Sequence, residues 1–522
     1  MFTFFIEQFG CRATQADGAA LENQLLQRGY TPATRNVADV VIVNTCTVTS
    51  AADAQARDVI RKITANNRAA RVIVTGCYAQ RAPEELAALP GVAWVVGNSH
   101  KPELPQIVQN LPLPSLSTDF VSTASLLSQP RRLEEQARIL TGPFENTPLL
   151  SAPIFGREGN HTRPTLKIQD GCNSRCSFCV IPFVRGKSRS LSPESVISEI
   201  NSLVNSGVRE VVLSGINLGT YGKDLTPRFS FDNLLRRILD ETPLERLRIS
   251  SIEPMDVTSD LIDFFAANHR IAQHLHMPLQ SGTDRILAAM HRWYRSEHYA
   301  RRVRLIRERL PNAAVGADVI AGFPGETDEE HSSTVRFIES LPFTYLHVFS
   351  FSKRPSTAAA KLTNEVPANV VKNRARELRA ISDGKSAAFR REQIGRLHRV
   401  LTLRSGIEEV GPTKTPVSVV NPLVLDKSRG DRESGYTPAL SSNYLRVRLL
   451  ESSEANQWLD VRIIAEKENY LVAVAAMPNG IKTAARACVG QPIAQKYLRL
   501  ENYLCQSLVR SVCDADRDIL YP

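Results

Sequence analysis

The stretch "QDGCNSRCSFCVIPFVRGKSRS", residues 169–190, holds three cysteines, Cys172, Cys176 and Cys179, with no fourth nearby. A structural zinc site or a ferredoxin-type cluster uses four protein ligands. Three thiolates can instead hold three irons of a 4Fe-4S cube, so that the fourth iron accepts an outside ligand. The C-x-x-x-C-x-x-C spacing therefore predicts a metal centre with one open position.

The sequence around this loop predicts a partial (β/α)6 barrel over residues 161–393. Strand-like runs begin near residues 165, 210, 246, 274, 315 and 345 and alternate with helical segments. One helix is expected to begin with Ser192 as N-cap and Pro193 at its first position, and to end at Gly207. Because the cysteine loop follows the first strand, it should lie at the mouth of the barrel, where catalytic groups are found.

An N-terminal unit over residues 1–112 is predicted to be a parallel α/β domain. The runs "TFFIEQF", "ADVVIVNT", "RVIVTG" and "AWVVGN" alternate with helical stretches at 17–27 and 50–65. Cys11, Cys46 and Cys77 each fall at or just beyond the end of one of these strands. Since parallel strands end along one edge, the three cysteines could converge there, although three buried apolar thiols are the alternative.

The rest of the chain divides into three segments. Residues 113–160 are rich in Pro and Ser and predict a linker, with one short helix near 131–139. Four strand-like runs within 394–475 predict a small β-barrel. A helical tail is expected over 476–522, where Cys488, Cys505 and Cys513 lack ligand spacing and are interpreted as structural. The predicted fold class is thus α/β, with a parallel α/β domain, a partial barrel and a small β-barrel.

Composition limits the class of protein and its partners. The chain has 522 residues, 43% hydrophobic and 23% charged, as in a soluble protein of about three domains. With no apolar run of about 18 residues and no signal peptide, we expect a cytoplasmic protein with reduced cysteines and no membrane span. The net charge of +10 is concentrated in 285–310 and 371–400, which can attract phosphate backbones, although such arginines often form a solvated helix face.

The cysteine loop, with Phe178 before its last cysteine, resembles the radical S-adenosylmethionine (SAM) superfamily. In that superfamily SAM chelates the open iron of a 4Fe-4S cluster and is cleaved to a 5′-deoxyadenosyl radical. The segments "LSGINLG", "SSIEP", "HMPLQSG" and "DVIAGFPGE" resemble its cofactor contacts by position. Taken singly, each could be an ordinary strand-end turn. The resemblance implies SAM contacts by Gly215, Asn217, Glu253, Gln280 and Glu326, and no catalytic side chain beyond the cluster ligands.

The segments "FGCRATQAD", "NTCTVT" and "TGCYAQ", combined with this barrel, resemble the methylthiotransferase family over residues 1–475 apart from the linker. The resemblance implies that Cys11, Cys46 and Cys77 hold a second 4Fe-4S cluster, which receives or supplies sulfur. It implies tRNA as partner, together with an electron donor and a sulfur source that the sequence does not identify. "SGYTPALSSNYLRVRLLES" and "WLDVRIIAE" resemble the RNA-binding TRAM domain, although Tyr444 and Arg446 could be ordinary core and solvent positions of a strand.

Within that family, "NTCTVT", "GCYAQ" and "LKIQDGCN" are most similar to the members that methylthiolate N6-threonylcarbamoyladenosine at C2, at position 37 directly 3′ of the anticodon. The alternatives are isopentenyladenosine in tRNA, a ribosomal protein side chain, or a non-catalytic iron-sulfur RNA-binding protein. One departure from the family is Thr14, which stands where Asn is common. Arg185, Lys187 and Arg189 are expected to meet SAM or an RNA phosphate, with a solvated basic loop as the alternative.

Overall fold

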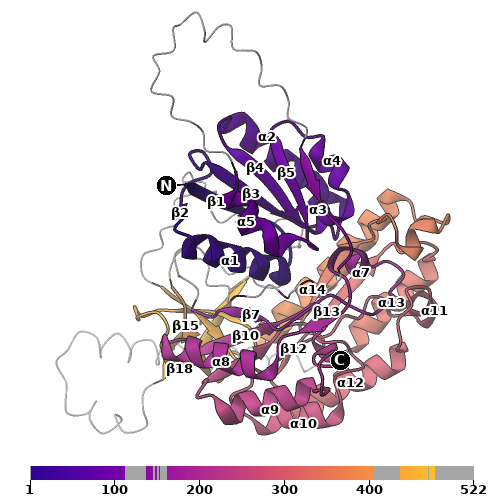
Figure 1. The fold of residues 1–522 in the computed structure, drawn as a ribbon. Coiled ribbons are helices and arrows are strands. Elements are labelled where there is room, and N and C mark those ends of the chain that lie inside the picture. The colour runs from indigo at the N-terminus through magenta and orange to yellow at the C-terminus, as the bar shows by residue number, and fades with distance from the viewer. Residues whose placement is uncertain are drawn as a thin grey trace, which may run out of the picture.

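The computed structural model describes residues 2–111, 137–144, 147, 149, 152, 162–404, 436–467 and 469–476. Most of the predicted linker, the tail from 477 onward and the tail cysteines Cys488, Cys505 and Cys513 lie outside these residues. Figure 1 shows an N-terminal α/β unit in indigo, a helix-lined barrel in magenta to orange and a small barrel in yellow. Among the described residues, no helix is both long and apolar enough to cross a membrane.

The N-terminal domain is a parallel sheet covered by helices on both faces, as predicted. Its strands follow the order β2-β1-β3-β4-β5-β6, and their bounds are Thr3–Gln8 (β1), Thr31–Pro32 (β2), Val40–Thr45 (β3), Arg71–Gly76 (β4), Val92–Gly97 (β5) and Arg138–Leu140 (β6). Strand β6 comes from the predicted linker, so the expected helix near 131–139 is wrong at residues 138 and 139, and residues 131–136 lie outside the described part. The order of the first five strands places a topological switch point between β1 and β3, where α/β sheets bind ligands.

The helices of this domain pack by their apolar faces. Helices α1 (Arg12–Gln27) and α5 (Leu104–Gln109) cover one face of the sheet, where Leu21, Leu25 and Val108 meet Ile42. Helices α2 (Ser50–Asn66) and α4 (Pro83–Ala87) cover the other face. Strand β3 is buried at every position, as a central parallel strand must be. The short helices α3 (Cys77–Arg81) and η1 (Lys101–Glu103) follow β4 and β5.

The central domain has all six predicted parallel strands: β7 (Thr165–Lys167), β10 (Glu210–Ser214), β11 (Arg246–Ile249), β12 (His274–His276), β13 (Ala314–Ala321) and β14 (Tyr345–Ser350). They form the sheets β11-β10-β7 and β12-β13-β14, which a bridge between Ser251 and His276 joins into one partial barrel. The short strands β8 (Gln169–Asp170) and β9 (Arg189–Ser190) pair beside the cysteine loop.

Helices surround the outside of this barrel. They are α8 (Pro193–Asn205), α9 (Phe231–Glu241), α10 (Ser259–Ala267), α11 (Asp284–Ala289), α12 (Ser296–Arg309), α13 (Asp328–Ser340) and α14 (Ala368–Arg391), with the 3-10 turns η2 (Leu218–Thr220) and η3 (Ala358–Lys361). The short helix α7 (Ile181–Arg185) instead packs against α3 of the N-terminal domain. The predicted start of α8 is confirmed: the Ser192 side chain accepts a hydrogen bond from Ser195 N, and Pro193 is the first helical residue. The helix ends at Asn205, two residues before the expected Gly207.

The C-terminal domain is a closed barrel of order β15-β16-β17-β19-β18. Its strands are β15 (Leu397–Thr402), β16 (Thr437–Ser441), β17 (Arg446–Leu449), β18 (Trp458–Lys467) and β19 (Tyr470–Ala475). The sequence predicted four of them and missed β16, because Pro438 argues against a strand. This barrel closes the amino end of the central one, where both hydrogen bonds from Arg248 to the Ser441 and Ser442 carbonyls measure 3.1 Å.

Candidate functional site

The loop with Cys172, Cys176 and Cys179 is held rigidly at the carboxyl end of β7 and β8. Gly171 starts it with φ +70°, and a Cβ there would lie 2.0 Å from the Lys187 carbonyl oxygen, so only glycine fits. Ser177 fastens its middle to the end of α11, because its N–H donates to Met290 O at 3.0 Å and its hydroxyl to Ala289 O at 2.7 Å. The loop is thus fixed independently of any ligand.

The sulfurs of this loop have donors and neighbours suited to a metal cluster. Arg292 Nη1 donates to Cys176 Sγ at 3.3 Å, and Ser174 N donates to Cys172 Sγ at 3.3 Å. Burial, together with the adjacent sulfurs of Cys176 and Cys172, raises the pKa of the Cys179 thiol to about 12. Three thiolates this close repel one another, and bound cationic iron would reverse that repulsion.

The second triplet forms at the switch point of the N-terminal sheet, as predicted from strand ends. Cys11 follows β1, Cys46 follows β3 and Cys77 starts α3 after β4. Gly10 has φ +96°, and a Cβ there would lie 2.5 Å from Cys46 Cβ, so glycine allows the first two cysteines to approach. Burial raises the pKa of Cys46 to about 12, with Cys11 and Cys77 adding to the shift. The interpretation of unrelated apolar thiols is therefore disfavoured.

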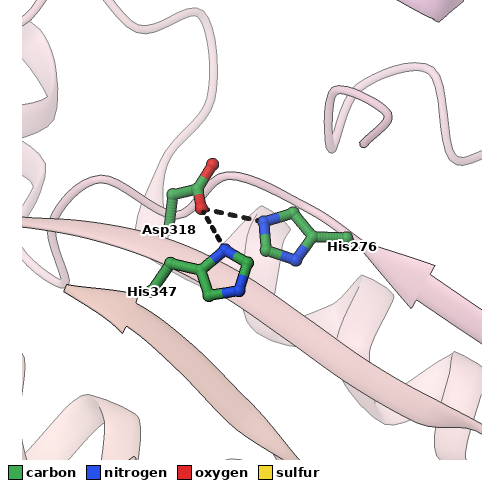
Figure 2. Close-up of side chains that lie close together, drawn as sticks. All are labelled: His276, Asp318 and His347. Carbon is green, nitrogen blue, oxygen red and sulfur yellow. Dashed lines mark hydrogen bonds and ion pairs between the residues drawn. The ribbon is translucent and has the colours of Figure 1, made fainter. Parts of the chain in front are cut away.

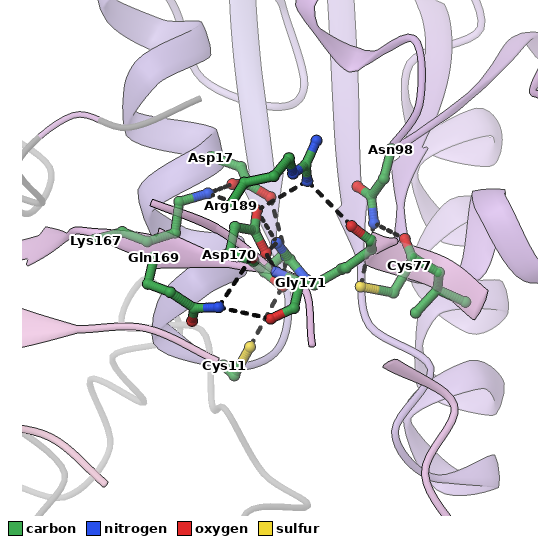
Figure 3. A network of polar contacts seen from close by, with 12 residues as sticks. Cys11, Asp17, Cys77, Asn98, Lys167, Gln169, Asp170, Gly171 and Arg189 are labelled. Atoms are coloured by element: carbon green, nitrogen blue, oxygen red, sulfur yellow. Dashed lines mark hydrogen bonds and ion pairs between the residues drawn. The ribbon is translucent and has the colours of Figure 1, made fainter. Parts of the chain in front are cut away.

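The two triplets meet through helix α7. Cys77 packs against Val180 and Val184, and Val180 follows Cys179 directly in the chain. Asn98, at the end of β5, donates to both Cys77 Sγ at 3.4 Å and Val184 O at 2.8 Å (Figure 3). The first cluster loop and the second triplet are thus connected by a single short helix.

A buried ionic network joins the two domains beside this helix (Figure 3). Asp17 of α1 accepts from Lys101 at 2.9 Å, from Arg185 at 3.0 Å and from Lys167 of β7. Asp170 accepts from Arg185 Nη1 with both of its oxygens at 2.8 Å, and its Oδ2 also accepts from Lys167 at 3.0 Å. Burial would raise the pKa of Asp17, but the three cations outweigh it and hold that pKa well below its usual range. Two carboxylates and three cations therefore bind the domains together.

This network shows what Arg185 contacts, and it includes Thr14, the residue that departs from the family pattern. Arg185 is only 1% exposed and is occupied by Asp17 and Asp170, so the prediction that it meets SAM or an RNA phosphate is wrong. Arg189 donates to Thr147 O and Arg185 O, whereas Lys187 is exposed. Thr14, the unusual residue, accepts from Arg185 at 3.1 Å and lies 3.7 Å from Cys11 Sγ.

A second buried contact anchors the N-terminal domain on the loop after β14. Arg354 Nη1 donates to Asp53 Oδ2 at 2.6 Å, and Arg81 Nη2 donates to the same oxygen at 3.1 Å. Thr47, directly after Cys46, donates its hydroxyl to Asp53 Oδ1 at 2.6 Å. The loop that carries Cys46 is therefore fixed from both domains.

The five residues expected to contact SAM all follow strands of the central barrel, but their surroundings differ. Two of them, Gly215 and Asn217, lie beside the start of the cysteine loop. Asn217 is buried, its N–H donates to Gln169 Oε1 at 2.8 Å, and its Oδ1 has no partner among the described residues. A Cβ on Gly215 would lie 3.0 Å from the same Gln169 oxygen, so both residues adjoin the start of the cluster loop. A buried, unsatisfied amide oxygen beside that loop fits a position for a ligand.

The other three predicted SAM contacts, Glu253, Gln280 and Glu326, already form ion pairs or hydrogen bonds with other parts of the barrel. Glu253 forms an ion pair with Arg292, the residue that also contacts Cys176. Gln280 has φ +65°, and its backbone pairs with β13 through Asp318 O at 2.7 Å. Glu326 Oε2 accepts from Gly322 N and from Arg374, each at 2.8 Å, so this oxygen holds its own loop. All five residues remain predicted SAM contacts.

The sequence reasoning missed Arg292, Asn98 and Asp17. Asn98 ends the predicted "AWVVGN" strand, so the strand-end rule that found the cysteines could have found it. Arg292 and Asp17 carry no local signal, because their partners lie far away in the sequence. Tyr444 was left open as a core or RNA-binding position, and its ring lies 4.6 Å from the His274 ring, between the two barrels.

Two family models match this chain. The model of the radical SAM superfamily matches residues 166–338, and the one described as "Uncharacterized protein family UPF0004" matches residues 3–97. The barrel, its open three-cysteine loop and these matches define a radical SAM protein. Membership of that class implies one 4Fe-4S cluster and SAM, and the donor set of Cys172, Cys176 and Cys179 fits such a cluster.

Curated relatives define the family more narrowly. The threonylcarbamoyladenosine tRNA methylthiotransferase MtaB of Aquifex aeolicus is 35% identical over 422 residues, 78% of this chain and 97% of the relative. The protein of the same name from Bacillus subtilis is 38% identical, over 73% and 81%. A tRNA-2-methylthio-N(6)-dimethylallyladenosine synthase of Paenarthrobacter aurescens is 34% identical, over 79% and 76%. The chain belongs to the radical SAM methylthiotransferase family.

Proposed function

We propose that this protein methylthiolates tRNA at C2 of N6-threonylcarbamoyladenosine 37 to give 2-methylthio-N6-threonylcarbamoyladenosine. The observation that carries the proposal is the direct packing of Cys77, in one three-cysteine set, on the helix that follows Cys179 in the other. An unactivated aromatic C–H needs a radical for its activation, and sulfur must be held close to that radical. The relatives named for this nucleoside are 35% and 38% identical to the chain, against 34% for the dimethylallyladenosine synthase of Paenarthrobacter aurescens, which favours threonylcarbamoyladenosine over dimethylallyladenosine.

Two 4Fe-4S clusters are part of the proposal. Cys172, Cys176 and Cys179 would hold the cluster that binds SAM, and Cys11, Cys46 and Cys77 would hold the second. When bound, these groups and SAM supply the radical and the sulfur, while the protein supplies alignment. Asn217, through its unsatisfied Oδ1, is suited to hold a donor group of SAM, such as its amino group.

The protein's own residues orient these sites. Arg292 connects Cys176 to Glu253, so the first cluster loop and a proposed SAM contact move together. Gln169 holds Asn217 N and, through its amide nitrogen, the Gly171 carbonyl at 2.8 Å. Such hydrogen bonds behind metal ligands commonly change metal affinity or activity about 10- to 100-fold when removed.

The proposal assigns one task to each domain. Residues 1–112 would carry the second cluster, 161–393 the radical chemistry, and 394–475 would act as a TRAM-like RNA-binding barrel, joined by the linker at 113–160. The enzyme would act on tRNA in the cytoplasm. It needs an electron donor and a sulfur source, both to be identified. The basic segments at 285–310 and 371–400 can contribute attraction for the RNA backbone.

Anaerobic reconstitution tests the two-cluster proposal. The full chain should bind about eight irons as two cubanes. Cys172→Ala should abolish SAM cleavage, whereas Cys46→Ala should spare SAM cleavage and stop methylthiolation. Cys505→Ala, in the predicted tail, is the matched control and should change neither activity. A single cluster per chain with all six cysteines intact would rule out the arrangement.

A further inference from the structure

Three polar side chains from neighbouring strands meet inside the central barrel, away from the cysteines. His276 ends β12, Asp318 lies in β13 and His347 in β14 (Figure 2). Their chain neighbours Leu275, Ala317 and Leu346 belong to the apolar core between strands and helices. Because strand side chains alternate, the three polar groups face the interior of the barrel. We refer to them as the lumen cluster.

One oxygen of Asp318 holds both imidazoles. Asp318 Oδ1 lies 2.9 Å from His276 Nε2 and 3.3 Å from His347 Nδ1. An ionised carboxylate only accepts hydrogen bonds, so both nitrogens carry a proton. Burial would raise the pKa of Asp318, but the two histidines outweigh burial and keep that pKa well below its usual range. The carboxylate is therefore charged inside the barrel.

The hydrogen bonds behind His276 determine which proton assignment is acceptable. Tyr345 Oη lies 3.0 Å from His276 Nδ1 and 2.8 Å from His274 Nε2. If Tyr345 donates to His276, then His274 Nε2–H donates to Tyr345, and the buried His274 Nδ1 is a bare lone pair. His274 Nδ1 has no hydrogen-bond partner among the described residues. Leaving a buried lone pair without a partner costs less than leaving a buried N–H without an acceptor. Every hydrogen bond of the lumen cluster is therefore satisfied when Tyr345 donates to His276 Nδ1 and His274 Nε2 donates to Tyr345.

A metal ion would break this pattern. The lumen cluster has the composition of a two-histidine, one-carboxylate site, and its ligand atoms lie within 4.8 Å of one another. To bind a metal, however, His276 Nε2 must lose its proton and move it to Nδ1. Tyr345 must then donate to His274, which leaves a buried His274 Nδ1–H without an acceptor. The geometry favours a ligand that forms hydrogen bonds over a cation.

Two groups of the lumen cluster remain available to such a ligand. Within the described part of the chain, Asp318 Oδ2 and His347 Nε2 have no partner, and Figure 2 shows both pointing away from the shared oxygen. The Asp318 and His347 side chains are 22% and 32% exposed, so both can be reached from the barrel interior. Asp318 O also accepts the backbone bond from Gln280, the proposed SAM contact. The available groups therefore lie on the strand that holds Gln280 and on its neighbour β14, and a base that binds next to SAM would come close to them.

We propose that the lumen cluster recognises a polar substituent on the adenine of the substrate, with Asp318 Oδ2 accepting from an O–H or N–H of that substituent and His347 Nε2 contacting its neighbour. This inference rests on the proposed function. A threonylcarbamoyl group carries a hydroxyl and ureido N–H donors, whereas a dimethylallyl group carries none. Burying Asp318 Oδ2 against an apolar group would leave it unsatisfied, which disfavours the dimethylallyl substrate.

The test compares RNA binding and turnover by the reconstituted full chain. Anticodon stem-loops with threonylcarbamoyladenosine, dimethylallyladenosine or unmodified adenosine are the probes. His347→Phe and Asp318→Asn should each reduce the preference for the threonylcarbamoyl loop over the unmodified loop about tenfold, mainly in Kd and KM. His298→Phe, an exposed histidine on α12, is the matched control and should keep the preference. SAM cleavage without RNA reports whether the fold and the cluster survive.

Each outcome decides the inference. An unchanged preference in both variants, with intact SAM cleavage, overturns it. So does one equivalent of Zn²⁺ or Mn²⁺ that binds beyond the cluster iron and is lost in His347→Phe, since this identifies a metal site. If the wild type ignores the threonylcarbamoyl loop and modifies the dimethylallyl loop, the proposed function fails as well, and the wild-type data alone reveal this.

Discussion

Replacement of Asp17 by Asn is the sharpest perturbation of the contact between the N-terminal and central domains. The side chain keeps its shape but loses its charge, at the centre of a network where Lys101, Lys167 and Arg185 share two carboxylates. Lys101 then keeps only the neutral Asn44 Oδ1 at 3.2 Å, while Lys167 and Arg185 share the single carboxylate of Asp170. The structure thus predicts an uncompensated buried charge at the interface.

The expected magnitude follows from that burial. Removing one partner of a buried ion pair commonly costs about 3–5 kcal/mol, whereas an exposed pair contributes about 0–1 kcal/mol. Asp58 of α2, which pairs with Arg61 in solvent at 3.1 Å, supplies the control Asp58→Asn. The free energy of unfolding, measured by urea titration, should fall by about 3–5 kcal/mol in Asp17→Asn and by less than about 1 kcal/mol in the control.

A functional readout separates the interface from the central domain alone. Asp17 touches neither cysteine triplet, so SAM cleavage should persist in Asp17→Asn under conditions where the variant remains folded, while methylthiolation should fall because the two triplets lose their alignment. If Asp17→Asn matches Asp58→Asn in stability and keeps methylthiolation, the ionic network does not hold the domains together and the reasoning is refuted.

Three further predictions concern the two triplets and the network. Gly10→Ala should lose about four irons, one cubane, because its Cβ would collide with Cys46, whereas Gly29→Ala, also at positive φ but with open space, should keep them by iron assay. Arg292→Gln should lower the rate of SAM cleavage about 10- to 100-fold, measured as 5′-deoxyadenosine release, and a rate within twofold would argue against its role. Burial alone would raise the pKa of Asp170, but the surrounding cations lower that pKa from 3.8 to about 2. The ionised Asp170 side chain therefore contributes its full stabilisation of the folded state at neutral pH, and this contribution is lost as the pH falls from about 4 to 2. The stability difference between wild type and Asp170→Asn should stay constant from pH 8 to 5 and shrink below 4 in urea titrations, and a difference that already shrinks near pH 6 would contradict this pKa.

Much of the architecture could be predicted because it depends on local pattern and topology. Apolar runs separated by helical segments determine parallel strands, and parallel strands end at one edge. That rule was sufficient to bring Cys11, Cys46 and Cys77 together, although 31 and 35 residues separate them. Strand β16 was missed because its only local signal, a proline, points the other way.

The remaining features depend on distant partners that no local pattern specifies. From the sequence, Arg185 was expected to contact SAM or an RNA phosphate. In the structure it is paired with Asp17, which lies 168 residues earlier, so no local pattern could indicate this contact. Alternation could mark His276, Asp318 and His347 as facing one side of their strands. Only the register between β13 and β14, which pairs Asp318 with His347, brings them within hydrogen-bonding distance.

The central claim is that this chain adds a methylthio group to threonylcarbamoyladenosine in tRNA. The most direct measurement is mass spectrometry of tRNA nucleosides from cells with and without the gene. Deletion should remove 2-methylthio-N6-threonylcarbamoyladenosine and accumulate its unthiolated precursor, and the wild-type gene, but not Cys46→Ala, should restore the product. An unchanged nucleoside profile, or loss of the methylthio group from dimethylallyladenosine instead, would contradict the account.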